Sequence, residues 1–287
     1  MTSRAEFDIK TSGLLVASTY ADRIKGKTIL ITGVSPNGIG SATAAAFASQ
    51  APALLLLASR TPANLSAVVA DLQAAHPNLD VRPVTLDLSS QASVRAAAAE
   101  VARLTPKLDL LVNNAGLSAA ARQDGTRPGE TRVVNLASGA HAISPIRFSD
   151  YNIEKGADPD EGYLGIVAYG QSKTANILFT VSLQKELPKK GISAYCLHPG
   201  GVRTQLGRQQ DDDMNAAIEK TASYWKDIDQ GCSTTMVAAL DPGLDEQSGL
   251  YLDNCQFTTP IPHATNPASA DRLWSLSEEL VGEKFSL

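Results

Sequence analysis

The chain has 287 residues, of which 43% are hydrophobic and 19% charged, and its formal net charge is −5. This length suffices for one large α/β domain or two small ones, and the acidic balance gives no reason to expect a nucleic-acid partner or a polybasic membrane surface. The three cysteines and four histidines show no metal-ligand spacing, and the longest apolar run near the N-terminus, residues 14–17, is too short for a membrane span. We therefore expect a soluble cytoplasmic protein without a metal.

Residues 27–32 form a short apolar run without polar alternation, which is typical of a strand buried on both faces. A glycine-rich turn follows, and residues 41–50 are Ala-rich and helical. This order places a helix N-terminus at the turn, where glycines let the backbone approach a pyrophosphate. We predict a dinucleotide site, with an ordinary βα turn as the alternative, at Gly33, Ser35, Asn37, Gly38, Ile39 and Gly40.

The strand-and-helix pattern then repeats, with strands at 53–58, 79–86 and 108–112 and helices at 63–75 and 90–104. Such alternation predicts an α/β fold with a doubly wound parallel sheet, covered by helices on both faces.

Arg60 directly follows the second strand, and no acidic residue is near it in the sequence. A basic residue there accommodates the 2′-phosphate of NADP, whereas a carboxylate would bind the ribose hydroxyls of NAD. We therefore favour NADP(H) as the cofactor, and the alternative is a solvated arginine.

Tyr169 and Lys173 lie four residues apart at the start of a predicted helix, residues 169–187, which follows a strand at 131–136. Both side chains would share one helix face, where the ammonium lowers the phenol pKa and favours proton transfer at a carbonyl. Taken alone, the spacing is more typical of an exposed helix pair, and the other motifs favour the proton-transfer role. Further strands are predicted at 192–197 and 249–252.

Five motifs in this order resemble the short-chain dehydrogenase/reductase family, in its retinol-dehydrogenase-like and fungal branch. They are the glycine turn, Asn113-Asn114-Ala115-Gly116, Ser138 at a strand end, the Tyr169–Lys173 pair, and the loop from His198 to Thr204. The resemblance implies one Rossmann-fold domain over residues 24–287, preceded by an extension over 1–23, with a lid over 203–231.

The resemblance also implies roles. Tyr169 would protonate the substrate oxygen, Lys173 would lower the tyrosine pKa and bind the nicotinamide ribose, and Ser138 would donate a hydrogen bond to the substrate oxygen. For Ser138 the alternative is a strand-end hydroxyl bonded to its own loop. Further cofactor contacts are implied at Asp87, Leu88, Asn114, Ala115, Gly116, Pro199, Gly200, Val202 and Thr204.

Two features depart from the family pattern. The glycine turn carries one extra residue, which Pro36 and Asn37 can accommodate as turn formers. Only fourteen residues, 117–130, precede the strand at 131–136, and Asp124-Gly125 and Pro128-Gly129 interrupt any helix there. We expect a shortened crossover between the fourth and fifth strands, without the family's covering helix or its catalytic asparagine. Because that helix usually builds an oligomer interface, any oligomer would use another surface.

The leading hypothesis is an NADP(H)-dependent reductase of a carbonyl, or the reverse alcohol dehydrogenase, acting on a small lipophilic molecule. Lipophilic secondary metabolites, retinoid- or steroid-like alcohols and small aldehydes all remain open as substrates. The shortened crossover motivates a second hypothesis, a catalytically impaired NADP(H)-binding protein that acts through interactions. A third is a non-redox isomerase or dehydratase on the same fold.

Overall fold

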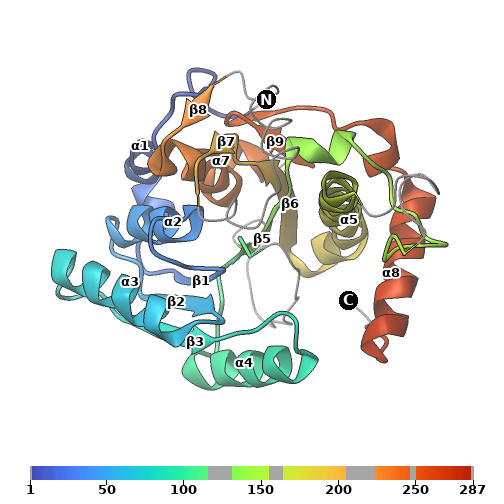
Figure 1. The fold of residues 1–287 in the computed structure, drawn as a ribbon. Coiled ribbons are helices and arrows are strands. Elements are labelled where there is room, and N and C mark those ends of the chain that lie inside the picture. Colours follow the sequence, from blue (N-terminus) through green and yellow to red (C-terminus); the bar gives the residue numbers. More distant parts are fainter. Residues whose placement is uncertain (1, 116–130, 155–163, 205–223, 246–249, 286–287) are drawn as a thin grey trace.

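The computed structural model describes residues 2–115, 131–154, 164–204, 224–245 and 250–285 (Figure 1). Its main sheet has eight strands in the order β10-β9-β6-β5-β4-β1-β2-β3, and all neighbours are parallel except β9 and β10. The strands are β1 (Thr28–Thr32), β2 (Leu54–Ser59), β3 (Val81–Thr85), β4 (Leu110–Asn113), β5 (Thr131–Leu136), β6 (Ile192–His198), β9 (Tyr251–Asp253) and β10 (Gln256–Phe257).

The strand order reverses between β1 and β4, because β1 continues to β2 and β3 on one side while β4 continues to β5 and β6 on the other. This arrangement confirms the predicted doubly wound sheet. In such sheets the crevice for a ligand lies at the carboxyl ends of the strands, at the point of reversal. A separate two-stranded pair is formed by β7 (Gly201–Val202) and β8 (Trp225–Lys226).

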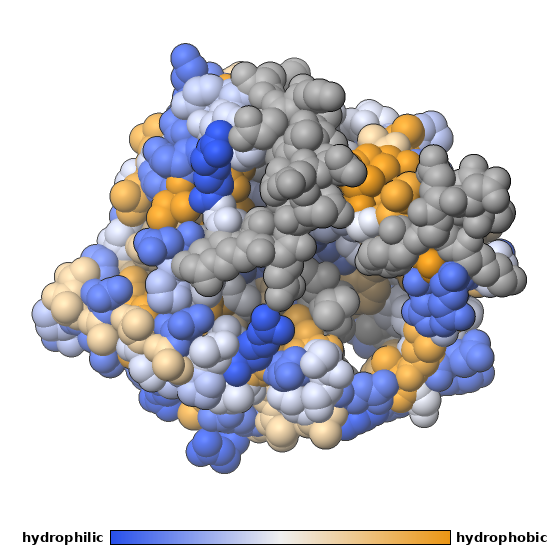
Figure 2. Space-filling view, viewed as in Figure 1, coloured by the Kyte–Doolittle hydropathy of each residue, from blue (hydrophilic) through white to orange (hydrophobic). Residues whose placement is uncertain are grey.

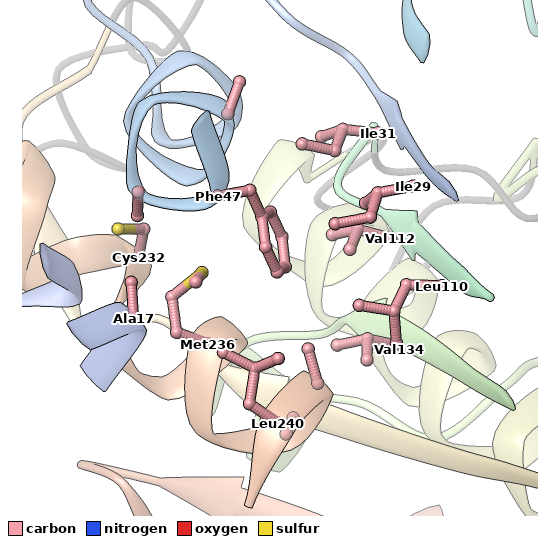
Figure 3. Packing of buried hydrophobic residues seen from close by; sticks show 14 of the residues in the cluster. Ala17, Ile29, Ile31, Phe47, Leu110, Val112, Val134, Cys232, Met236 and Leu240 are labelled. Carbon is pink, nitrogen blue, oxygen red and sulfur yellow. The ribbon is translucent and has the colours of Figure 1, made fainter. Parts of the chain in front are cut away.

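Helices cover both faces of the sheet (Figure 1). The largest core cluster joins the sheet to one set of helices (Figure 3), namely α1 (Gly13–Thr19), α2 (Ile39–Ala48), α3 (Pro62–Ala75) and α7 (Ile228–Leu240). Clusters on the opposite face involve α4 (Gln91–Leu104), α5 (Gly165–Glu186) and α8 (Pro267–Val281). Short 3₁₀ turns connect these elements: η1 (Ala21–Arg23), η2 (Gly139–Ala142), η3 (Leu187–Lys190), η5 (Pro242–Leu244) and η6 (Pro262–Ala264).

The N-terminal segment packs into the fold. Val16, Ala17 and Ile24 are fully buried, and α1 lies against α7 so closely that a Cβ on Gly13 would be 2.2 Å from Cys232 Sγ. The sequence assigns residues 1–23 to an extension, whereas the described part of this segment contributes to the largest core cluster.

The crossover after β4 and most of the predicted lid, residues 205–223, lie outside the described residues. The strands that the crossover joins are adjacent, with Leu110 paired to Arg132. Of the remaining lid residues, Trp225 and Lys226 form β8, and α7 begins at Ile228. The last predicted strand is observed as β9, and Gly249 at its expected start is outside the described part.

Within the described ranges, no helix combines the length and the apolar character needed to cross a membrane.

Candidate active site

The glycine turn between β1 and α2 is tightly packed. Gly33 has a φ of 70°, and a Cβ on it would lie 2.7 Å from Ala115 Cα. A Cβ on Gly40 would lie 2.7 Å from Asn114 Nδ2 and 2.9 Å from Gly33 O. Any larger residue at either position would push the turn away from the end of β4.

Asn114 and Ala115 hold this turn against β4. The Asn114 side-chain amide donates to Thr32 O at 2.8 Å and to Gly33 O at 3.0 Å, and Ala115 N donates to Thr32 O at 3.1 Å. Asn37, one of the two turn formers before Gly38, has a φ of 58°. Gly38 is the N-cap of α2, so the helix N-terminus lies at the turn, as the sequence predicts.

Arg60 and Asp87 follow β2 and β3, which are neighbouring parallel strands. Asp87 accepts hydrogen bonds from the Ser89 hydroxyl at 2.7 Å and the Ser89 N–H at 3.0 Å. These bonds lower the Asp87 pKa, and the positive charge of Arg60 lowers it further. The sequence places no acid near Arg60, but the fold brings this carboxylate within its electrostatic reach. Leu88 packs against the α4 core cluster.

Ser138 lies just beyond β5 and forms the N-cap of η2. Its hydroxyl oxygen accepts from Ala140 N at 3.2 Å, which is the loop contact that the sequence raises as an alternative. The same side chain lies near Tyr169 and lowers its pKa. The two interpretations are therefore compatible, because a hydroxyl that caps the turn by accepting still has a proton to donate.

His141 contacts the backbone of Ser138. Its Nδ1 is 2.7 Å from Ser138 O, and its Nε2 accepts from Ile261 N at 3.3 Å. Burial lowers the His141 pKa, and these partners select the neutral ring with the proton on Nδ1. The sequence shows no metal-ligand spacing around His141 and gives no sign that this residue contacts the Ser138 backbone.

Tyr169 and Lys173 occupy the first turns of α5, with Lys173 Nζ 5.3 Å from the centroid of the tyrosine ring. The sequence predicts that the lysine lowers the tyrosine pKa. In the structure, burial raises the Tyr169 pKa, and the nearby Ser138 hydroxyl lowers it by less. Burial also lowers the Lys173 pKa to about 8. The prediction that the Tyr169 pKa is lowered is thus wrong, because the rise in pKa caused by loss of solvent is larger than the lowering by neighbouring groups.

Gly170 lets α5 approach η2. A Cβ at this position would lie 2.9 Å from Ala140 O and 2.9 Å from Ile143 Cβ. The missing side chain therefore allows the backbone next to Tyr169 to reach the turn that carries Ser138.

A chain of buried polar side chains fixes α5 to the sheet. Asn113 Nδ2 donates to Asn135 Oδ1 at 2.8 Å, and Asn135 Nδ2 donates to Thr180 Oγ1 at 2.9 Å. Asn176 Nδ2 donates to Leu136 O at 2.8 Å. The roles of these asparagines depend on strand pairing, which one sequence does not show.

The loop after β6 is held by β8 and α7. Gly200 has a φ of 94°, and Val202 pairs with Lys226. A Cβ on Gly231 of α7 would lie 2.7 Å from Val202 Cγ2, so the loop also packs against this helix. Pro199 and Thr204 belong to the same described loop.

The described site residues thus gather at the carboxyl ends of β1, β2, β3, β4, β5 and β6 and at the start of α5. Gly116 lies outside the described residues. Exposed Ile143 and Ile261 lie beside His141, with exposed fractions of 45% and 37%. Figure 2 shows hydrophobic surface on the side of the molecule where α5 and α8 lie in Figure 1.

Comparison with known families identifies the chain. A family profile described as short chain dehydrogenase matches residues 27–137 and 158–215. Retinol dehydrogenase 12 of Mus musculus is 33% identical over 91% of this chain and 88% of its own. Short-chain dehydrogenase/reductase prx1 of Penicillium roqueforti is 29% identical over 91% of this chain and 86% of its own.

Solved structures share the fold. A short chain dehydrogenase from Burkholderia cenocepacia J2315 in complex with NADP has a TM-score of 0.60 and 23% identity, over 80% of this chain and 97% of its own. The RhlG/NADP complex of Pseudomonas aeruginosa has a TM-score of 0.57 and 23% identity, over 80% of this chain and 94% of its own.

Proposed function

The chain belongs to the short-chain dehydrogenase/reductase family, and from this premise we propose that it is an NADP(H)-dependent oxidoreductase. It reduces a carbonyl group, or oxidises the corresponding alcohol, on a small lipophilic molecule. The observation that carries the proposal is the gathering of Ser138, Tyr169 and Lys173 at one place, with the Ser138 hydroxyl close enough to lower the Tyr169 pKa and Lys173 Nζ 5.3 Å from the tyrosine ring centroid.

The turn residues fit a dinucleotide. Gly33 and Gly40 have no room for a Cβ, and the N-terminus of α2 lies at the turn, which suits a pyrophosphate. Arg60 supports the 2′-phosphate of NADP. Further contacts come from Asn114 and Ala115 and from the loop at Pro199, Gly200, Val202 and Thr204. When bound, the cofactor supplies or accepts a hydride at the carbonyl carbon.

Tyr169 provides the proton. Because burial raises its pKa, the phenol is protonated at neutral pH and donates to the substrate oxygen as negative charge develops there. Ser138 donates a second hydrogen bond to the same oxygen and limits the charge that the phenol must neutralise.

Lys173 stabilises the phenolate that remains after proton transfer. Its side chain is only 8% exposed, so its charge acts through a medium of low effective dielectric constant. With a pKa of about 8, the amine is mostly charged at neutral pH and still able to exchange its proton.

Exposed apolar side chains near Ser138 favour a lipophilic substrate. Ile143 and Ile261 are exposed next to the groups that position Ser138, and apolar side chains at a site entrance gain free energy when a ligand covers them.

The direct test is oxidation of NADPH and of NADH by the purified protein with a mixed panel of aldehydes and ketones. We expect turnover with at least one apolar carbonyl and a preference for NADPH. Binding of NADPH without turnover of any member would favour the catalytically impaired protein instead. Conversion of substrate without net loss of NADPH would favour an isomerase or dehydratase.

A further inference from the structure

Buried polar atoms without hydrogen-bond partners gather beneath the loop that follows β6. Lys226 is 3% exposed, and its Nζ makes no hydrogen bond within the described part of the chain. The same holds for His198 Nδ1, Asp253 Oδ1 and Asn254 Oδ1. Because a buried polar group without a partner destabilises the fold, several of them at one place require a physical explanation.

Strand pairing brings these groups together. His198 and Asp253 are directly paired on the parallel strands β6 and β9, so their side chains lie on the same face of the sheet. Lys226 approaches from β8, and its Cδ and Cε would each be 2.8 Å from a Cβ on Gly200, with Nζ at 3.1 Å. The lysine stem therefore fills the space beneath the loop two residues after His198.

The charges around Lys226 agree with this placement. Burial lowers the Lys226 pKa, while Cys255, Asp253 and Asp8 raise it. The His198 pKa is lowered chiefly by burial, while the charge of Asp253 raises it and that of Lys226 lowers it. All three groups therefore interact, although these buried atoms make no hydrogen bond to one another.

We propose that Lys226, His198 and Asp253 together bind a buried water molecule, and that Lys226 is a positioning residue for the loop over Gly200. The ammonium donates to the water oxygen, and the two water protons are donated to Asp253 Oδ1 and His198 Nδ1. A water with three such partners matches the usual coordination of buried water.

The His198 ring is oriented for this role. Its Nε2 faces Gly139, where an added Cβ would lie 3.5 Å away, so Nδ1 is the ring nitrogen directed toward the paired strand. The neutral ring with the proton on Nε2 leaves Nδ1 as an acceptor.

The site fixes the loop in two ways. The aliphatic stem of Lys226 supports Gly200, and the ammonium connects the loop through the water to β6 and β9. The consequence for the cofactor rests on the proposed function, which gives this loop contacts with the cofactor. The water site itself does not depend on that function.

A double-mutant cycle in thermal unfolding tests the site without turnover. Lys226→Met keeps most of the stem and removes the ammonium, and Asp253→Asn removes the carboxylate charge. We expect each change to lower Tm by roughly 2–4 °C, and the double variant to lie no lower than either single variant. Additive losses, or a higher Tm for Lys226→Met, would contradict the proposal.

Crystallography supplies the second readout. A structure that resolves ordered water should show one within hydrogen-bond distance of Lys226 Nζ, Asp253 Oδ1 and His198 Nδ1. A direct contact between Lys226 Nζ and Asp253, with no water at this place, would overturn the assignment.

NADPH binding measured by fluorescence titration tests the positioning role. Lys226→Met should weaken binding about tenfold and raise KM with little change in kcat, because the loop contacts the cofactor equally before and during reaction. Lys189→Met is the matched control, since this lysine is exposed and pairs with Glu186 on the surface. Unchanged affinity in Lys226→Met would remove the positioning role. If the wild-type protein did not bind NADPH, the proposed function would be contradicted. The unfolding measurements would still test the water site, because they do not depend on NADPH.

Discussion

Tyr169 and Lys173 are ionisable groups whose charged forms are both opposed by burial. The phenol pKa is raised and the amine pKa is lowered, so the pair is closer to neutral than two solvated side chains would be. Their separation of four residues on a helix indicates that the two side chains are neighbours, but it does not indicate how deeply each side chain is buried. The sign of the tyrosine shift therefore could not be read from the sequence.

The Lys173 pKa predicts a pH dependence of stability. Below pH 8 the lysine is protonated in both the folded and the unfolded chain, so its burial cost is constant. Between pH 8 and the unfolded value near 10.5, the unfolded chain binds more protons, and the free energy of unfolding rises with pH. The total gain is about 3 kcal/mol.

Urea denaturation of the wild type and of Lys173→Met from pH 7.5 to 10 checks this slope. The difference in the free energy of unfolding between the two proteins should change by most of that amount over this pH range. Other groups titrate in both proteins, so their contributions cancel in the difference. A constant difference across the range would show that the folded lysine titrates near its ordinary pKa.

At the scale of elements, β2, β4 and β5 could be predicted closely because each is a short buried run between turn residues. The run at 131–136 is observed with these bounds as β5, and Ser90, where the helix at 90–104 is predicted to begin, is the N-cap of α4. The predicted helix at 169–187 begins four residues earlier, at Gly165, since Leu164 is its N-cap and Gly165 carries no strong start signal. The start of α7 could not be predicted either. The helix is rich in Ser and Thr and buries several of them, so its sequence lacks a clear apolar face.

Gly170 gives a prediction at this scale. Gly170→Ala adds a Cβ that meets Ala140 O and Ile143 Cβ at 2.9 Å, so α5 must move away from η2. We expect a loss of stability of about 1–3 kcal/mol and a fall in kcat of at least about tenfold as Tyr169 separates from Ser138. Steady-state kinetics and denaturation measure both effects. Ser172→Ala on the exposed side of the same helix should change neither, and full activity in Gly170→Ala would show that the close approach is unnecessary.

At the scale of the whole molecule, the core extends beyond the strands and helices that the sequence defines. Arg132 is fully buried in β5, donates to Ala238 O at 2.9 Å and Asp241 O at 2.7 Å, and pairs with Asp245. Asp245 also pairs with Arg23 at 2.9 Å, which joins the N-terminal segment to the sheet. These contacts link residues more than 80 positions apart, and a single sequence contains no signal for such pairs.

The N-terminal segment should therefore contribute to stability. Val16→Ala truncates a fully buried side chain of α1, and we expect it to lower the free energy of unfolding by about 1.5–3 kcal/mol. Leu14→Ala is the matched control, because Leu14 is 49% exposed and its truncation should cost little. Denaturant titration distinguishes them. Equal effects of the two changes would mean that the segment behaves as a detached extension.

The measurement that tests the central claim most directly is the single-turnover rate of NADPH oxidation by the wild type and by Tyr169→Phe, using a carbonyl that the wild type reduces. Tyr151→Phe, at an exposed tyrosine, serves as the control. We predict that Tyr169→Phe binds NADPH with unchanged affinity and loses roughly 10²–10⁴-fold in rate, because the general acid is removed. A Tyr169→Phe protein that oxidises NADPH at the wild-type rate would contradict the assignment of Tyr169 as the proton donor.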